Sequence, residues 1–302
     1  MSNTPIKVAF IGLDTSHSVQ FAQYIQDPAI PEADRCTDLL VTRCMRFETP
    51  FQGKDGLDAR QKQLEALGIL VTEDFDEAVA DCDAIFLEIN DPTLHLEYFQ
   101  KCAKLGKPIF LDKPFADTLA NAKAIARIAE ENNIKFFTAS KLRNFQTIED
   151  LAAKNLNVAT AMAWGSLGKC PEGYSLIIWY GVHTFELLER FMGVGAESVL
   201  TLPTSTGFDC QIKYKDGRSA LVKMNSTIGG GYGCWVIGDN KVECALAQSG
   251  TPINMLNNFV ALCRGAAPAV TVEESLEIMA MLEAAEKSYQ SGKIEMLESL
   301  EY

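Results

Sequence analysis

The first 140 residues alternate short apolar runs with helical patterns, and no other feature of the sequence restricts the fold as strongly. We expect strands at residues 6–11, 39–47, 69–72, 83–89, 109–112 and 135–139. Between them the apolar spacing predicts helices at residues 18–26, 75–79, 94–105 and 119–131. Strands that are apolar throughout are typical of a parallel sheet covered on both faces. The sequence therefore predicts an α/β domain with a doubly wound parallel sheet, whose ligand crevice lies at the carboxyl ends of the strands.

The pattern changes after residue 140. Residues 208–214 alternate apolar and polar side chains, Asp216-Gly217 supplies a hairpin turn, and residues 219–224, 235–237 and 241–247 continue in the same way. Thr271 and Glu274 fit a capping box at the start of a closing helix that would end near Gly292. We therefore predict a second, α+β domain on an open, mostly antiparallel sheet.

Composition narrows the classes of function. The chain has 302 residues, 47% of them hydrophobic, which is enough to bury the cores of two domains. A formal net charge of −13 argues against a nucleic-acid surface. No apolar run approaches the roughly 20 residues of a membrane span, and no signal peptide precedes the first strand. Nine cysteines form no Cys-x-x-Cys pair, so we expect a cytoplasmic protein without a disulfide framework or a membrane partner.

Only three histidines occur in the chain. His17 follows the first predicted strand, His95 opens the helix after the fourth, and His183 lies at a predicted helix start in the second half. Histidine titrates near neutrality, so each is either a group for proton transfer or a hydrogen-bonded structural residue. The dipole at a helix N-terminus disfavours imidazolium, which favours a structural role for His95.

The segment Gly106-Lys-Pro-Ile-Phe-Leu-Asp-Lys113-Pro114 resembles the Gly-Lys-x-x-x-x-Glu-Lys-Pro motif of the Gfo/Idh/MocA (glucose-fructose oxidoreductase / inositol dehydrogenase) family, with Asp112 in place of the usual Glu. Gly181-Val-His183-Thr-Phe-Glu186 resembles the family's Gly-x-His-x-x-Asp. The resemblance runs nearly the whole length of the chain. It implies an NAD(P)-dependent oxidoreductase of sugars, polyols or similar hydroxy compounds. A Rossmann-type dinucleotide-binding domain would span residues 1–139, and a domain for substrate binding and oligomerisation residues 140–302.

The same resemblance suggests a cis Lys113–Pro114 bond and a homo-oligomer whose subunits pair through the second sheet. Lys113 would donate to a substrate hydroxyl, and His183 would take the hydroxyl proton as hydride leaves for the nicotinamide. The candidate cofactor-binding residues are Gly12, Asp14, Thr15, Ser16, His17, Glu48, Asn90 and Asp112. The candidate substrate-binding residues are His95, Trp179 and Arg143, and no metal ligand is assigned. Arg46-Phe47-Glu48 offers both an acid and a base near the second strand's end, with NAD slightly favoured over NADP.

The sequence departs from the family pattern in two places. The dinucleotide fingerprint Gly-x-Gly-x-x-Gly is here Gly12-Leu-Asp14-Thr-Ser-His17, which keeps only the first glycine. Asp14 either faces the diphosphate and repels it, or turns away to cap the helix, as Ser16 also could. Trp179 stands where the family has a catalytic aspartate, and Glu186, one turn after His183, could partly replace it.

Two other functions stay open. One is a descendant of the family that binds a sugar-like ligand without hydride transfer. The other is a metal-dependent hydrolase or lyase that uses His17, His95 or His183 together with Asp14, Asp91 or Glu186.

Overall fold

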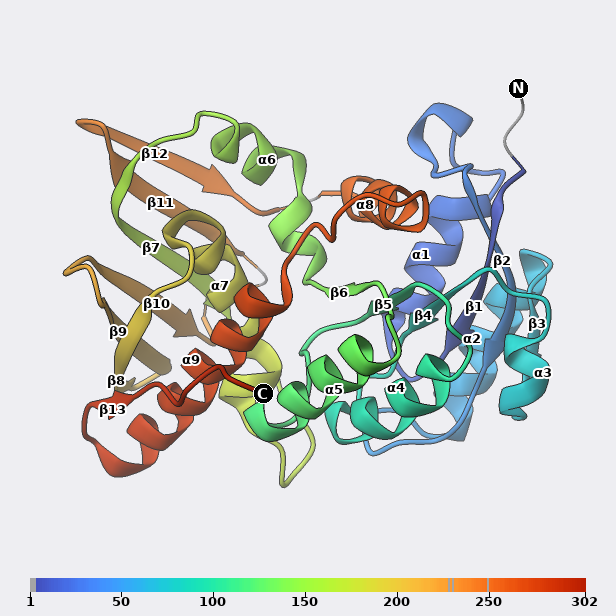
Figure 1. The fold of residues 1–302 in the computed structure, drawn as a ribbon, viewed down its shortest axis with the longest axis horizontal. Coiled ribbons are helices and arrows are strands. Elements are labelled where there is room, and N and C mark those ends of the chain that lie inside the picture. Colours follow the sequence, from blue (N-terminus) through green and yellow to red (C-terminus); the bar gives the residue numbers. More distant parts are fainter. Residues whose placement is uncertain (1–3, 228, 230, 249) are drawn as a thin grey trace. The chain divides into compact units, whose positions relative to one another are not determined.

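The computed structural model describes residues 4–227, 229, 231–248 and 250–302, and the chain divides into two compact units (Figure 1). Unit 1 comprises Met1–Ala116, Ala124–Thr138 and Thr251–Val270. Unit 2 comprises Asp117–Lys123, Ala139–Gly250 and Thr271–Tyr302. One division, between Thr138 and Ala139, lies beside the predicted boundary at 139/140. The exchange of two further segments between the units was not predicted.

Unit 1 contains the predicted parallel sheet, in the order β3-β2-β1-β4-β5-β6. Its strands are β1 (Ile6–Ile11), β2 (Leu39–Met45), β3 (Leu70–Thr72), β4 (Ala84–Leu87), β5 (Ile109–Leu111) and β6 (Phe136–Thr138). Its helices are α1 (Ser16–Gln26), α2 (Lys54–Ala66), α3 (Phe75–Val79), α4 (His95–Ala103), α8 (Ile253–Cys263) and the later part of α5 (Leu119–Glu131). This strand order reverses direction between β1 and β4, and ligands of such sheets bind at that switch point.

Helix α8 belongs to unit 1 although it lies more than 110 residues after β6. Its Phe259 is fully buried and meets Phe86 of β4 edge to face, with ring centroids 4.6 Å apart. Phe110 and Phe137 of the neighbouring strands lie 6.4 and 6.5 Å from the same ring. A phenylalanine buried in this way stabilises a fold by about 1.5–3 kcal/mol, so the aromatic cluster holds α8 on the sheet.

Unit 2 is built on a seven-stranded sheet in the order β12-β11-β7-β10-β9-β8-β13. Within the described residues of this sheet, only the β7–β10 pair is parallel, so the sheet is mostly antiparallel, as predicted. Its strands are β7 (Val158–Ser166), β8 (Ala196–Thr204), β9 (Gly207–Tyr214), β10 (Ser219–Asn225), β11 (Gly233–Gly238), β12 (Lys241–Leu246) and β13 (Glu295–Met296). Its helices are α6 (Gln146–Ala152), α7 (Leu176–Met192), α9 (Val272–Ser291) and the start of α5.

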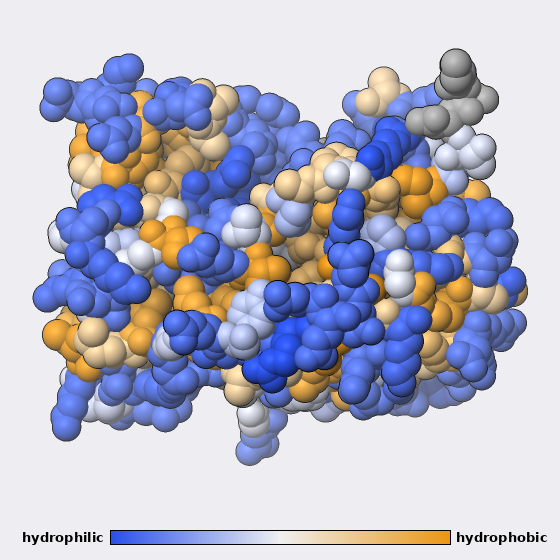
Figure 2. Space-filling view, in the orientation of Figure 1, coloured by the Kyte–Doolittle hydropathy of each residue, from blue (hydrophilic) through white to orange (hydrophobic). Residues whose placement is uncertain are grey.

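Helices α7 and α9 pack on one face of this sheet, α7 against β7 and β10 and α9 against β8. The strands accordingly alternate buried and exposed residues, most clearly in β9 and β10. The predicted capping box of Thr271 and Glu274 begins α9, and Gly292 ends it in the left-handed conformation. Figure 2 shows hydrophobic residues at the surface in the region of β7, β11 and β12, bordered by hydrophilic ones.

Within the described ranges, none of the helices combines the length and apolar character that crossing a membrane requires.

Candidate functional site

The carboxyl ends of β1, β2, β4 and β5 carry most of the residues that the sequence analysis assigned to the cofactor. Gly12, directly after β1, has φ +110°, and a Cβ there would lie 2.2 Å from the carbonyl oxygen of Glu88. A side chain at this position would therefore collide with the backbone after β4. Close packing at the switch point explains why this one glycine of the fingerprint is present.

Asp14, in the place of the second glycine, is buried and turned into the protein. Its carboxylate accepts hydrogen bonds from the Thr49 hydroxyl and from the backbone N–H of Asn90, both at 2.8 Å. Burial raises the pKa of Asp14, and these two hydrogen bonds partly offset the rise. The Arg60 guanidinium, which donates to the carbonyl of Leu13, adds a favourable charge interaction with Asp14. Asp14 thus joins the loops that follow β1, β2 and β4.

The cap of α1 is Thr15, whose hydroxyl accepts from the N–H of His17 at 3.2 Å. The expectation that Asp14 or Ser16 caps this helix is therefore wrong, because Ser16 is already the first helical residue. Ser16 is exposed, whereas Thr15 is buried. The exposed hydroxyl of Ser16 therefore lies at the N-terminus of α1, and the N-terminus of a helix suits the binding of an anion.

His17, in the place of the third glycine, pairs with Asp112 at the end of β5. The distance from Nδ1 to the carboxylate is 2.7 Å, and both side chains are buried. The ring also stacks on Phe21, one turn along α1, at 5.3 Å. One contact therefore joins His17, in the place of the third fingerprint glycine, to Asp112, in the place of the glutamate of the Gly-Lys-x-x-x-x-Glu-Lys-Pro motif.

Burial by itself raises the pKa of Asp112, but the facing His17 and the adjacent Lys113 lower it to about 2. Lys113 is buried, and its peptide bond to Pro114 is cis, as the resemblance suggested. The predicted polarising lysine thus stands at the carboxyl end of β5 beside an ionised carboxylate.

Glu88, which follows β4, completes a cluster with His17 and Asp112. One ligand-type atom from each of the three side chains lies within 4.8 Å of the others, and all three residues are buried. Such a set could bind a cation, but Nδ1 of His17 and the carboxylate of Asp112 are already engaged with each other at 2.7 Å. The hypothesis of a metal-dependent hydrolase or lyase named Asp14, Asp91 or Glu186 as the acidic partners, and not Asp112 or Glu88. The sequence analysis did not consider Glu88.

The end of β2 carries the basic and acidic residues that the sequence analysis considered for the cofactor's ribose. Arg46 pairs with Asp58 at 2.7 Å and with Gln61 at 2.5 Å, and Glu73 lies 3.8 Å away. Its positive charge is therefore already balanced inside unit 1. Glu48 is exposed and accepts from the N–H of Lys54 at the start of α2.

His95 is fully buried, and its two ring nitrogens face backbone carbonyls. Nε2 lies 2.7 Å from the oxygen of Ile89 and Nδ1 3.2 Å from that of Phe115. The ring thereby ties the loop after β4 to the loop after β5. His95 was assigned to the substrate, but complete burial gives it this structural role within unit 1.

In unit 2, His183 lies in the middle of α7, so the prediction that it starts a helix is wrong. Its Nδ1 lies 2.6 Å from the hydroxyl of Ser140, and its ring meets Tyr232 edge to face at 5.6 Å. Trp179 lies one turn earlier on α7, half-buried, with its ring at 79° to that of Tyr180. No pattern in the sequence indicated that Ser140 or Tyr232 would meet the histidine.

Arg143 was expected to bind substrate, but its side chain is buried in unit 2 and engaged there. It donates to the carboxylate of Glu189 at 2.5 Å, to the carbonyl of Glu186 at 2.9 Å and to Glu274 at 3.2 Å. The structure thus makes Arg143 part of the packing of the Lys141–Asn144 turn against α7 and α9.

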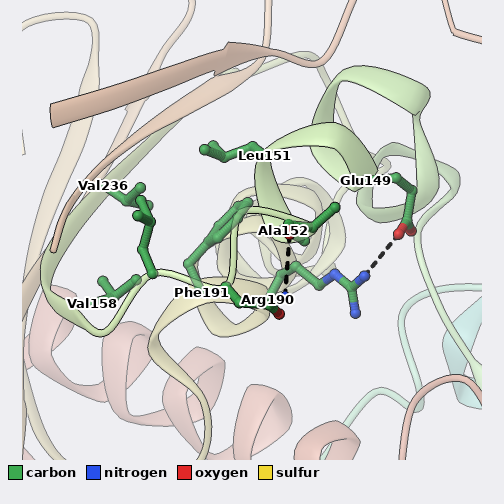
Figure 3. Close-up of a pocket in the computed structure, with 10 residues that line it drawn as sticks. Glu149, Leu151, Ala152, Val158, Arg190, Phe191 and Val236 are labelled. Carbon is green, nitrogen blue, oxygen red and sulfur yellow. Dashed lines mark hydrogen bonds and ion pairs between the residues drawn. The ribbon is translucent and has the colours of Figure 1, made fainter. Parts of the chain in front are cut away.

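A separate hollow of about 440 Å³ lies in unit 2, among α6, β7, β11 and the end of α7 (Figure 3). Val158, Val236 and Leu151 line its apolar part, and the ion pair of Arg190 with Glu149 borders it at 2.8 Å. None of the predicted site residues lines this hollow.

Comparison with known proteins agrees with this architecture. Residues 55–140 match the family model GFO_IDH_MocA, described as "Oxidoreductase family, NAD-binding Rossmann fold". No curated protein sequence matches the chain. Among solved structures, the chain is similar to myo-inositol dehydrogenase from Lactobacillus casei in complex with NAD(H) and myo-inositol. That match has a TM-score of 0.79 and 15% identity and covers 98% of each chain.

Two further structures are equally similar. Myo-inositol 2-dehydrogenase from Lactobacillus plantarum has a TM-score of 0.79 at 13% identity, covering 98% of this chain and 100% of that one. GenD2 from gentamicin A biosynthesis, in complex with NAD, has a TM-score of 0.79 at 14% identity, covering 99% and 98%. At these identities the likeness establishes the fold.

Proposed function

We propose that the protein is an NAD-dependent oxidoreductase of a sugar, polyol or similar hydroxy compound, and the match of residues 55–140 to the oxidoreductase family model supports this proposal. The single observation that carries the proposal is the position of Lys113. A buried lysine at the carboxyl end of a parallel strand, beside an ionised aspartate, is placed where such sheets bind their ligands.

The residues at this edge fit a dinucleotide despite the two lost glycines. The carboxylate of Asp14 is satisfied by Thr49 and Asn90 and balanced by Arg60, which reduces its repulsion of a diphosphate. The first turn of α1 and the hydroxyl of Ser16 would hold the diphosphate.

Glu48 would accept a hydrogen bond from the ribose 2′-hydroxyl. An NADP 2′-phosphate would instead meet this exposed carboxylate, with the charge of Arg46 already balanced. These features support NAD as the cofactor.

The proposed chemistry is oxidation of a CH–OH group to a carbonyl, or its reverse. When bound, the nicotinamide supplies the acceptor for the hydride. Lys113 donates a hydrogen bond to the substrate oxygen and stabilises the negative charge that develops on it. His183 accepts the hydroxyl proton as the C–H bond breaks, and in the reduction it returns that proton.

The test replaces Lys113 with methionine, which keeps the length of the side chain and removes the amine. With NAD and a panel of inositols and aldoses, we expect kcat/KM to fall by about 100-fold or more. NADH affinity should stay within about threefold of the wild type, because the amine is expected to stabilise the transition state and not to bind the cofactor. Ordinary turnover by Lys113→Met would remove the lysine from the mechanism.

Lys107→Met is the matched control. Lys107 lies in the same segment but just before β5, where its amine donates to the carbonyl of Cys82. It is therefore at the opposite edge of the sheet, and its replacement should leave activity within about twofold of the wild type.

A second candidate function is binding of a sugar-like ligand without hydride transfer. Asp14 and His17 in the glycine positions favour it, because both add side chains where a diphosphate usually approaches the backbone. This function predicts stabilisation of the protein by polyols, with no saturable binding of NADH.

We also propose a homo-oligomer that pairs through the face of the unit 2 sheet opposite α7 and α9. Leu221 of β10 and Leu202 of β8 are exposed at 41% and 53%. Trp164 of β7 and Trp235 of β11 are half-buried. An exposed apolar patch of this kind often marks an interface. Light scattering should give a multiple of 33.2 kDa, and Leu221→Asp should shift the mass toward one chain.

A further inference from the structure

Ser140, which the sequence analysis did not consider, contacts the proposed proton acceptor directly. Its hydroxyl lies 2.6 Å from Nδ1 of His183, and the serine is fully buried while the histidine is partly exposed. We propose that Ser140 is a positioning residue, which holds His183 with a proton on Nδ1 and so makes Nε2 the basic nitrogen. This inference rests on the proposed role of His183 in the reaction.

The position of the serine hydroxyl is fixed from two sides. The backbone N–H of Ser140 donates to both carboxylate oxygens of Glu186, at 2.8 and 2.7 Å. Its hydroxyl oxygen also accepts from the N–H of Leu142, at 3.3 Å, as the cap of the following turn. Glu186 lies three residues after His183, so the same face of α7 holds both the serine backbone and the ring that the serine contacts.

The chemistry of the pair selects one placement of its hydrogen. If the serine hydroxyl donated to Nδ1, a neutral ring would carry its proton on Nε2 and could not accept another there. If Nδ1–H donates to the serine oxygen, Nε2 keeps its lone pair, and the same hydrogen bond persists after the ring has taken a proton. Only the second placement suits a ring that accepts a hydroxyl proton at Nε2.

Ser140 also explains how the ring is oriented when the residue four positions earlier is Trp179. An indole offers no acceptor for Nδ1–H, whereas the serine oxygen does. The edge of Tyr232 against the ring limits its rotation on another side. Glu186 therefore acts on the histidine through Ser140, as a carboxylate that fixes the serine backbone.

The direct test is the ring nitrogen spectrum of His183 in ¹⁵N-histidine-labelled protein at neutral pH. With three histidines in the chain, the signals of His183 are those that disappear in His183→Gln. We expect the Nδ1–H form in the wild type and a shift toward the Nε2–H form in Ser140→Ala. Nε2–H in the wild type, or identical His183 signals in Ser140→Ala, would overturn the proposal.

Kinetics provide the second readout. Ser140→Ala should lower kcat by about tenfold or more with KM within about twofold, since the loss falls on proton transfer. Ser140→Thr, which keeps the hydroxyl, should restore most of that loss. Ser175→Ala is the matched control. The hydroxyl of Ser175 caps α7 by accepting from the N–H of Ile178, so this variant also removes a serine cap but leaves His183 untouched. An equal loss of kcat in Ser175→Ala would reduce Ser140 to a structural cap.

The two proposals fail in different ways. If the wild type turns over no substrate with either nicotinamide cofactor, the proposed oxidoreductase fails, but the spectrum of His183 still decides whether Ser140 sets its protonated nitrogen. If the enzyme is active and the spectrum does not respond to Ser140→Ala, only the positioning role is refuted.

Discussion

The pair of His17 and Asp112 allows a quantitative prediction from the structure. Asp112 is 1% exposed and lies 2.7 Å from Nδ1 of His17. Its pKa falls from an ordinary 3.8 to about 2, because the facing His17 and Lys113 outweigh the effect of burial. At about 1.4 kcal/mol per pH unit, this lowering of the pKa corresponds to roughly 2 kcal/mol of stability from the ionised carboxylate.

The perturbation is Asp112→Asn, which keeps the shape of the side chain and removes its charge. A carboxyl whose pKa is lowered in the folded state stabilises the protein above its unfolded pKa, and this contribution is lost as the pH falls toward the folded value. The free energy of unfolding of the variant should therefore lie roughly 2 kcal/mol below the wild type at pH 5 and roughly 1 kcal/mol below it at pH 3.

Urea denaturation followed by circular dichroism at these two pH values measures the difference directly. The double variant His17→Gln/Asp112→Asn tests its origin, because paired residues give non-additive losses. We expect the double variant to lose less than the sum of the two single variants. A stability difference that stays the same at pH 5 and pH 3, or additive losses, would refute the assignment of this energy to the pair.

The remaining predictions concern residues whose roles the structure revised. Asp14→Gly should lower the free energy of unfolding by about 2 kcal/mol in urea denaturation, because the donors of Thr49 and Asn90 lose their acceptor. The affinity for NADH should not rise. A clear rise in that affinity would mean that Asp14 faces the phosphates. Arg143→Met should cost about 3–5 kcal/mol in urea denaturation, because Glu189 is left buried without its partner. Arg143→Met/Glu189→Leu should recover most of that loss, and failure to recover would point to packing instead of charge.

The elements with strong local signals could be predicted from the sequence. Strand β1 and helices α3 and α5 have the predicted bounds, and the capping box of Thr271 is present. Helix α2 was not predicted, because only Leu57 and Leu64 of its residues are buried and its apolar periodicity is weak. The place of α8 in unit 1 depends on Phe259 meeting rings of β4 to β6, which no local pattern encodes.

The residues of the candidate site likewise include some that lie in a local motif and others that meet only in the folded chain. Lys113 and Asp112 could be proposed as site residues because their motif is contiguous in the sequence. The partner of Asp112 lies 95 residues earlier, and Ser140 lies 43 residues from His183, so both contacts exist only in the folded chain. Arg143 was assigned to the substrate because sequence alone does not show that Glu189 and Glu274 surround it.

The central claim is that the edge of the unit 1 sheet binds NAD. Titration of the purified protein with NADH and NADPH, followed by nicotinamide fluorescence, tests it most directly. We predict saturable NADH binding with a Kd below about 1 mM, and NADPH binding at least about tenfold weaker, a difference of about 1.4 kcal/mol. No saturable binding of either cofactor at millimolar concentration by the folded protein would contradict the account.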